Sequence, residues 1–66
     1  MLVVVNGTER ELADGATVAD VLAALDAPPR GIAVALNGEV VPRVDWSDTV
    51  LPPGGAVEVL TAVQGG

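Results

Sequence analysis

The side chains that usually carry out catalysis are largely missing from this 66-residue sequence, which contains no Cys and no His. Their absence removes thiolate nucleophiles, the usual zinc ligands and the commonest general base. The three basic side chains are arginines, at positions 10, 30 and 43, so neither a Schiff base nor a lysine-linked polymer of this chain can form. The chemically versatile group that is left is the carboxylate of Gly66, and we expect it to be the reactive group.

The sequence ends in Val63-Gln64-Gly65-Gly66. Two glycines make a thin segment whose backbone adopts conformations that other residues avoid. We therefore expect residues 63–66 to form a flexible tail that enters a narrow site of another protein. In this reading Val63, Gln64 and Gly65 thread the site, and four residues span at most about 13–14 Å.

The chain is strongly acidic, with nine Asp and Glu against three Arg and a formal net charge of −6. This balance disfavours nucleic acid and favours partners with a basic surface. The opening "MLVVV" is too short for the core of a signal peptide and has no basic leader, and no apolar run approaches the roughly 20 residues of a membrane span. We expect a cytoplasmic protein that does not bind membranes.

The first half of the sequence predicts a hairpin and one helix. An Asn6-Gly7 pair between the runs 1–5 and 8–12 is the strongest signal for a type I′ turn, and we interpret Asn6 as a turn residue only. Thr17 and Asp20 form a capping box, which predicts a helix that ends near Leu25 or Asp26, before the two prolines at 28 and 29. Its apolar face has helical spacing and consists of Val18, Val21, Leu22 and Leu25.

The second half predicts three strands. Residues 32–36 alternate large and small side chains before an Asn37-Gly38 turn, and a short strand follows at 40–41. Residues 43–55 are irregular, with Trp46 as an anchor, and 56–63 form the last strand. The expected fold is α+β of the β-grasp (ubiquitin-like) type: a mixed four- to five-stranded sheet with one α-helix packed on one face, formed by residues 1–62.

One face of this sheet is expected to be exposed and apolar. If Val57 and Val59 point at the helix, the two-residue period of a strand places Leu60 on the opposite face. The same alternation places Glu58 and four further aliphatic side chains there, and the predicted docking patch for partner proteins is Leu2, Val4, Ala33, Ala35 and Leu60.

Two stretches carry a resemblance to a known family. They are "LNGEVVPRVDW" at 36–46, with its Val-Pro-Arg and Trp pattern, and "QGG" at the end. With the β-grasp order, they make the chain similar to the ThiS family of sulfur carriers in the ThiS/MoaD ubiquitin-like superfamily. The resemblance implies that Gly66 is adenylated by a ThiF-like adenylyltransferase with ATP and Mg²⁺. Sulfur from a cysteine desulfurase or another persulfide donor then gives a thiocarboxylate, which serves a ThiG-like thiazole synthase in thiamine biosynthesis.

By this resemblance the chain is not an enzyme but a cosubstrate of other enzymes, binds no cofactor or metal itself, and is a monomer when free. Alternatives remain open from the sequence. The carrier could serve molybdopterin, tungsten-cofactor or sulfur-containing amino-acid synthesis, since a terminal Gly-Gly alone fits MoaD or ubiquitin equally well. The chain could instead be a ubiquitin-like protein modifier, or an interaction domain in which Gly-Gly has no role.

Overall fold

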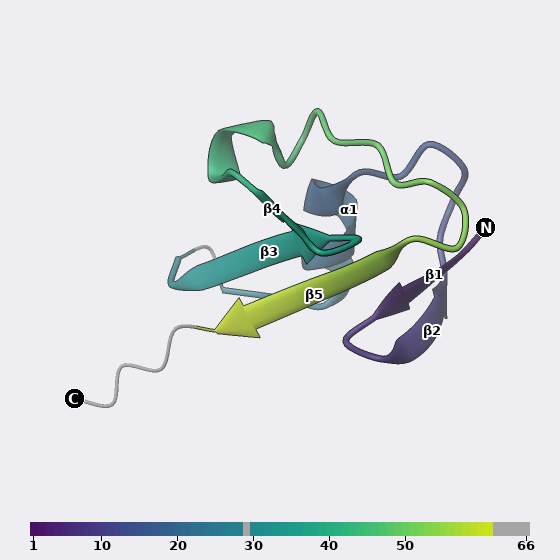
Figure 1. Cartoon of the computed structure of the whole chain (residues 1–66), viewed down its shortest axis with the longest axis horizontal. Helices are drawn as coiled ribbons and strands as arrows, with labels where there is room; N and C mark the ends of the chain where they lie inside the picture. Colours follow the sequence, from purple (N-terminus) through teal and green to yellow (C-terminus); the bar gives the residue numbers. More distant parts are fainter. Residues whose placement is uncertain (29, 62–66) are drawn as a thin grey trace.

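The computed structural model describes residues 1–28 and 30–61 of the chain. The predicted tail at 63–66 lies outside these residues, as does Pro29. The elements follow one another in the predicted order, except that a short 3₁₀ helix, η1, occupies part of the stretch expected to be irregular (Figure 1). Their bounds are β1 Leu2–Val5, β2 Thr8–Glu11, α1 Val18–Ala24, β3 Ile32–Leu36, β4 Glu39–Val41, η1 Arg43–Asp45 and β5 Ala56–Thr61.

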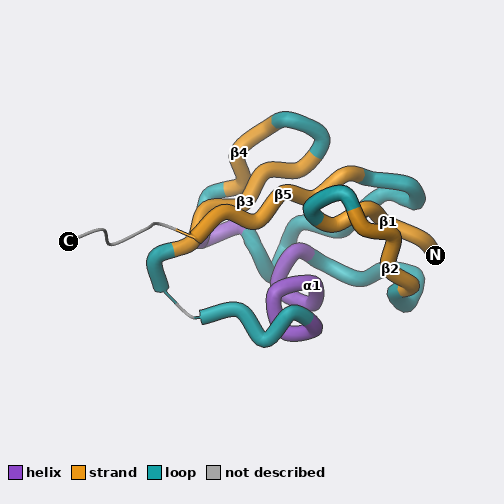
Figure 2. Tube along the Cα trace, turned by 90° about the horizontal axis from the view of Figure 1, so that it is seen from below, coloured by secondary structure: helices purple, strands orange, loops and turns teal. Residues whose placement is uncertain are grey.

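The five strands form one mixed sheet in the order β2-β1-β5-β3-β4. The central strand β5 runs parallel to β1 and antiparallel to β3, and the two hairpins extend the sheet on either side. The helix covers one face of this sheet (Figure 2). This arrangement confirms the predicted β-grasp fold with five strands and one helix.

Both Asn-Gly turns adopt the left-handed backbone that the sequence predicts. The φ angles are 50° and 82° at Asn6-Gly7, and 50° and 85° at Asn37-Gly38. Positive φ at both central residues is the requirement of a type I′ turn, whose twist matches that of the flanking strands. Each turn pairs the residues on either side of it directly and so fixes the register of its hairpin.

The helix begins at the predicted capping box. The Thr17 N–H donates to Oδ2 of Asp20 at 2.8 Å, and the Asp20 N–H donates to Oγ1 of Thr17 at 3.3 Å, so two otherwise unpaired amides of the first turn are satisfied. Val18, Val21 and Leu22 are buried, as the spacing predicts. The helix ends at its C-cap Leu25 and therefore spans seven residues, slightly fewer than expected.

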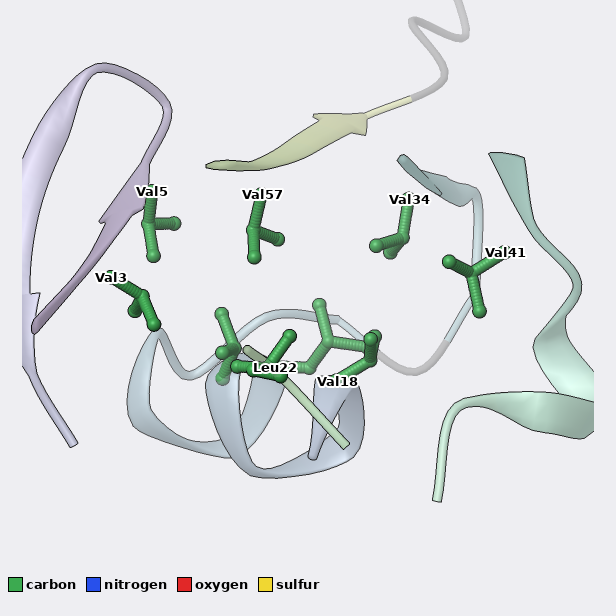
Figure 3. Close-up of a cluster of buried hydrophobic side chains, with 9 residues drawn as sticks. Val3, Val5, Val18, Leu22, Val34, Val41 and Val57 are labelled. Carbon is green, nitrogen blue, oxygen red and sulfur yellow. The ribbon is translucent and has the colours of Figure 1, made fainter. Parts of the chain in front are cut away.

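The core lies between the helix and the inner face of the sheet. Val5, Val57 and Val34 point from three adjacent strands toward Val18 and Leu22 of α1 (Figure 3). The core also contains Leu51, which is 2% exposed although it lies in the loop before β5. Sequence patterning gave no sign of this residue, because a loop has no periodicity that could reveal a buried side chain.

The loop that contains Leu51 is fixed by backbone contacts with the start of the helix. The Leu51 N–H donates to the carbonyl oxygen of Ala16 at 2.9 Å, and the Val18 N–H donates to that of Thr49 at 3.0 Å. These bonds hold the irregular segment against the core. No helix in the described ranges is long and apolar enough to cross a membrane.

Candidate functional site

The candidate reactive group, the carboxylate of Gly66, lies outside the described residues, as do the threading residues Val63, Gln64 and Gly65. What the structure shows is the strand that leads to them. β5 lies at the centre of the sheet, and its last described residue, Thr61, pairs with Ile32 at the start of β3. The end of β5 that leads toward the tail is therefore paired with β3 up to Thr61.

Two asparagine side chains add to the hold on β5. Oδ1 of Asn6 accepts from the Val59 N–H at 2.8 Å, and its Nδ2 donates to the Val59 carbonyl oxygen at 3.2 Å. On the other side, Oδ1 of Asn37 accepts from the Ala56 N–H at 2.9 Å. Asn6 thus continues the ladder beside β5 after β1 has turned away. The interpretation of Asn6 as a turn residue only was incomplete, because its side chain also replaces a missing strand.

The face of the sheet opposite the helix presents the predicted aliphatic side chains. Directly paired residues of antiparallel strands share a face, so the pairing of Ala33 with Leu60 and of Ala35 with Val40 places all four on this side. Leu60 is 66% exposed and Val40 is 77% exposed. We call this side the open face, and its described residues are Leu2, Val4, Glu9, Glu11, Ala33, Ala35, Val40, Ala56, Glu58 and Leu60.

Sequence reasoning missed Val40 and Ala56 on this face. Val40 could have been placed from the Asn37-Gly38 turn, because a two-residue turn pairs Ala35 with Val40. Ala56 could have been placed by the alternation that placed Leu60, since the two residues are four positions apart on the same strand. Its pairing with Val4 could not have been predicted in this way, because it joins strands far apart in the sequence.

The residues of the predicted docking patch are spread along the length of the open face. The Gly54 N–H donates to the carbonyl oxygen of Leu2, so Leu2 lies level with Gly54, two positions before β5 begins and six before Leu60. At the rise of an extended strand this separation is about 20 Å. The open face therefore has a half near Leu60, where β5 ends, and a distal half around Leu2 and Val4.

Acidic side chains interrupt the open face. Glu58 lies between the halves, paired with Ala35, while Glu9 and Glu11 on β2 pair with Val4 and Leu2. All three carboxylates are on exposed residues. The expectation of an apolar face was therefore only partly right, because the register of the first hairpin brings two glutamates next to its aliphatic residues.

The amino terminus lies at the distal end of the sheet. The Met1 ammonium donates to Oε2 of Glu11 at 2.9 Å and to the carbonyl oxygen of Leu12 at 2.7 Å, and lies 3.4 Å from Oδ1 of Asp14. The hydrogen bond with Glu11 is the largest influence and raises the pKa of this amino group above its ordinary value.

Trp46 anchors the segment after β4, as predicted. Its Nε1–H donates to the carbonyl oxygen of Val41 at 2.9 Å, and its ring packs against the core. The exposed guanidinium of Arg43 lies 6.0 Å from the ring centroid, at the limit of a cation–π contact. Both residues line an open hollow of about 370 Å³ between α1 and η1, on the helix side of the molecule.

Comparison with known proteins bears on the segment that the structure leaves undescribed. The model of the ThiS family matches residues 3–66, which is nearly the whole chain and includes the two terminal glycines. The chain belongs to the ThiS family. The resemblance found in the sequence is thereby confirmed.

Relatives within and around the ThiS family support this assignment. The sulfur carrier protein ThiS of Escherichia coli (strain K12) is 30% identical over 66 residues, and the match covers 100% of both chains. A thiazole synthase of Paramagnetospirillum magneticum (strain ATCC 700264 / AMB-1) is 32% identical over 66 residues, which are 100% of this chain and 20% of that protein. A segment similar to this ThiS-family chain is thus part of a thiazole synthase polypeptide.

Solved ThiS structures confirm the fold. The crystal structure of the thiamine biosynthesis protein ThiS from Geobacter metallireducens has a TM-score of 0.84 and 36% identity, with 100% of both chains covered. A solution structure of a thiamine biosynthesis protein from the same organism has a TM-score of 0.80 and 35% identity, with 100% of this chain and 88% of that chain covered.

Proposed function

We propose that this chain is a sulfur carrier of thiamine biosynthesis and that the carboxylate of Gly66 carries the sulfur. The observation that carries the proposal is the family match through residue 66, together with a relative named as a sulfur carrier that aligns over the full length of both chains. The composition supports it, because a chain without Cys cannot hold sulfur on a thiol of its own.

The chemistry requires activation of the terminal carboxylate. A carboxylate oxygen is a very poor leaving group, so a ThiF-like adenylyltransferase joins it to AMP, using ATP and Mg²⁺ and releasing pyrophosphate. The outer sulfur of a persulfide then displaces AMP at the acyl carbon to give an acyl disulfide. A thiol cleaves its S–S bond, which leaves a thiocarboxylate on Gly66 and a disulfide between that thiol and the donor sulfur. The chain contributes a substrate rather than catalytic groups, so it is a cosubstrate of other enzymes, and we place it in the cytoplasm, where ATP is available.

The tail has to carry this group into a partner's active site. Gly65 lets the backbone adopt the conformation that a narrow entrance requires, while Val63 and Gln64 guide the segment. The strand before them is paired with β1 at its start and with β3 up to Thr61, and the Asn6 side chain bonds to Val59. A paired strand that ends beside a short tail limits the positions that Gly66 can reach, which favours productive entry.

Thiazole synthase is the acceptor that we propose. In Paramagnetospirillum magneticum a segment similar to this chain is covalently part of a thiazole synthase. Joining two interacting domains in one chain raises their effective concentration. This arrangement favours the thiazole pathway over molybdopterin, tungsten-cofactor or amino-acid synthesis. Docking of both enzymes on the open face, through Leu2, Val4, Ala33, Ala35 and Leu60, is part of the proposal.

An ATP–pyrophosphate exchange assay with a purified ThiF-like enzyme tests the first step. The full chain should support exchange, and a chain that lacks Gly66 should support almost none. A chain with one extra alanine after Gly66 is the matched control, because it keeps the fold and a terminal carboxylate but misplaces that carboxylate. Full exchange by either altered chain would contradict the assignment of Gly66.

A further inference from the structure

We propose that the half of the open face nearest the tail docks the adenylating enzyme through apolar contacts and one basic side chain that pairs with Glu58 at the margin of this half. This inference rests on the proposed function and specifies the chemistry of the partner surface. We call this half the tail-proximal patch, and its residues are Ala33, Ala35, Val40, Glu58 and Leu60.

The length of the tail decides which half is covered. Five residues follow Thr61, and they span at most about 17 Å. The adenylating pocket therefore lies within that distance of the carboxyl end of β5. Leu60 and its pair Ala33 lie beside this end, whereas Leu2 lies about 20 Å behind it along the sheet. The surface of an enzyme that binds Gly66 therefore lies nearer to Leu60 than to Leu2.

The tail-proximal patch has the composition of the centre of an interface. Val40 and Leu60 are the large exposed aliphatic side chains, at 77% and 66%, and between them Ala33 and Ala35 are short. Covering such side chains removes apolar surface from water, which is favourable and non-directional. Apolar contact alone would therefore not fix the orientation of the partner.

Glu58 supplies the directional element. It pairs with Ala35 and is exposed at the β5 margin of the patch, two residues before Leu60. Within residues 1–28 and 30–61, the ion pairs are those of the Met1 ammonium with Glu11 and Asp14, and Glu58 takes part in none. Burying a carboxylate without a partner is costly. A surface that covers this patch must therefore bring an arginine or lysine to Glu58.

A second copy of the chain does not fit this requirement. Two copies packed face to face about a two-fold axis would place one acidic open face against the other, with no cation among the described residues of either face. The described residues of the open face include three glutamates and no cation, and Arg10 pairs with Val3 on the helix side. The net charge of −6 further opposes self-association and steers the chain toward a basic surface.

Titration calorimetry of a purified ThiF-like adenylyltransferase with variants of the chain tests this inference. Glu58→Lys should raise Kd by at least about tenfold. Glu39→Lys is the matched control, because Glu39 is an exposed β4 residue that pairs with Leu36 on the other side of the sheet. It changes the net charge equally and should alter Kd by no more than about twofold. Leu60→Asp should weaken binding more than Leu2→Asp, with circular dichroism confirming the fold of each.

Equal Kd values for the Glu58 and Glu39 variants would overturn the inference. A larger loss of affinity from Leu2→Asp than from Leu60→Asp would overturn it too. A wild-type dimer in sedimentation that Leu60→Asp dissociates would overturn it as well. The exchange assay separates these failures from failure of the proposed function. If the wild-type chain supports exchange but Glu58→Lys leaves Kd unchanged, the docking inference is wrong and the proposed function still stands.

Discussion

The side chain of Asn6 binds both backbone groups of Val59, accepting from its N–H at 2.8 Å and donating to its carbonyl oxygen at 3.2 Å. The two residues are 53 positions apart, and the contact joins the first turn of the chain to the strand that carries the tail. An amide that donates and accepts in this way reproduces the pattern of a neighbouring strand. The turn residue is thus also part of the support for β5.

Asn6→Gly should separate these two roles. Glycine accepts the positive φ of 50°, so the turn is retained while the two side-chain bonds are lost. We expect the free energy of unfolding to fall by about 1–2 kcal/mol. Urea denaturation measures this loss, and hydrogen exchange should show a less protected Val59 amide. An unchanged Val59 protection factor would mean that the two hydrogen bonds from the Asn6 side chain do not stabilise β5.

Leu51→Ala should be among the most destabilising single changes in the described chain. The side chain is 2% exposed and fills the core beneath an irregular loop, so truncation leaves a cavity and costs about 2–5 kcal/mol. Val44→Ala is the control, because Val44 is 83% exposed and its truncation should change stability by less than about 0.5 kcal/mol. Thermal unfolding of both variants checks the prediction. Similar losses of stability in the two variants would contradict the packing of Leu51 in the core.

The Met1 amino group should make stability depend on pH in the alkaline range. Its pKa is raised in the folded chain, so its contribution is complete below the ordinary value of 8.0 and is lost as the pH rises through the folded value. The sequence has no Cys and no Tyr, and its cations are arginines, so no other side chain titrates there. Stability should fall slightly above about pH 8.

Glu11→Gln should reduce this dependence, because Glu11 is the main cause of the raised pKa. Urea midpoints measured from neutral to alkaline pH would check both curves. A wild-type stability that rose with pH in this range would contradict the ion pair.

Trp46→Phe should weaken the attachment of η1 to the sheet. The substitution keeps an aromatic ring but leaves the Val41 carbonyl without its 2.9 Å donor, which costs about 1–2 kcal/mol. Arg43→Ala removes only an exposed cation 6.0 Å from the ring and should cost less than about 1 kcal/mol. Urea denaturation of the two variants compares their free energies of unfolding. A larger loss of stability from Arg43→Ala than from Trp46→Phe would contradict the anchoring role of the Trp46 hydrogen bond.

Local signals in the sequence were enough to predict most of the fold. Asn6-Gly7 and Asn37-Gly38 fix two hairpins because few other pairs accept positive φ twice, and the Thr17–Asp20 box fixes the start of the helix. The long-range features could not be read in the same way. The bonds from Asn6 to Val59 and from Leu51 to Ala16 arise only when distant segments meet.

For the candidate site, the sequence predicted the face on which side chains lie better than the distances between them. Alternation placed Leu60 and Ala33 on the open face correctly, since period two is a property of every strand. It did not show that Leu2 lies about 20 Å away, because the separation depends on how β1 aligns with β5. It also missed the glutamates of β2, whose side follows from the register of the hairpin.

Intact mass spectrometry of the chain after incubation with a ThiF-like adenylyltransferase, ATP, a persulfide donor and a thiol shows whether Gly66 accepts sulfur. We predict that the mass rises by the difference between one sulfur and one oxygen atom. A chain that lacks Gly66 should show no such rise, and peptide mapping should place the change at residue 66. An unchanged mass, with an enzyme shown to be active on its own carrier, would contradict the account.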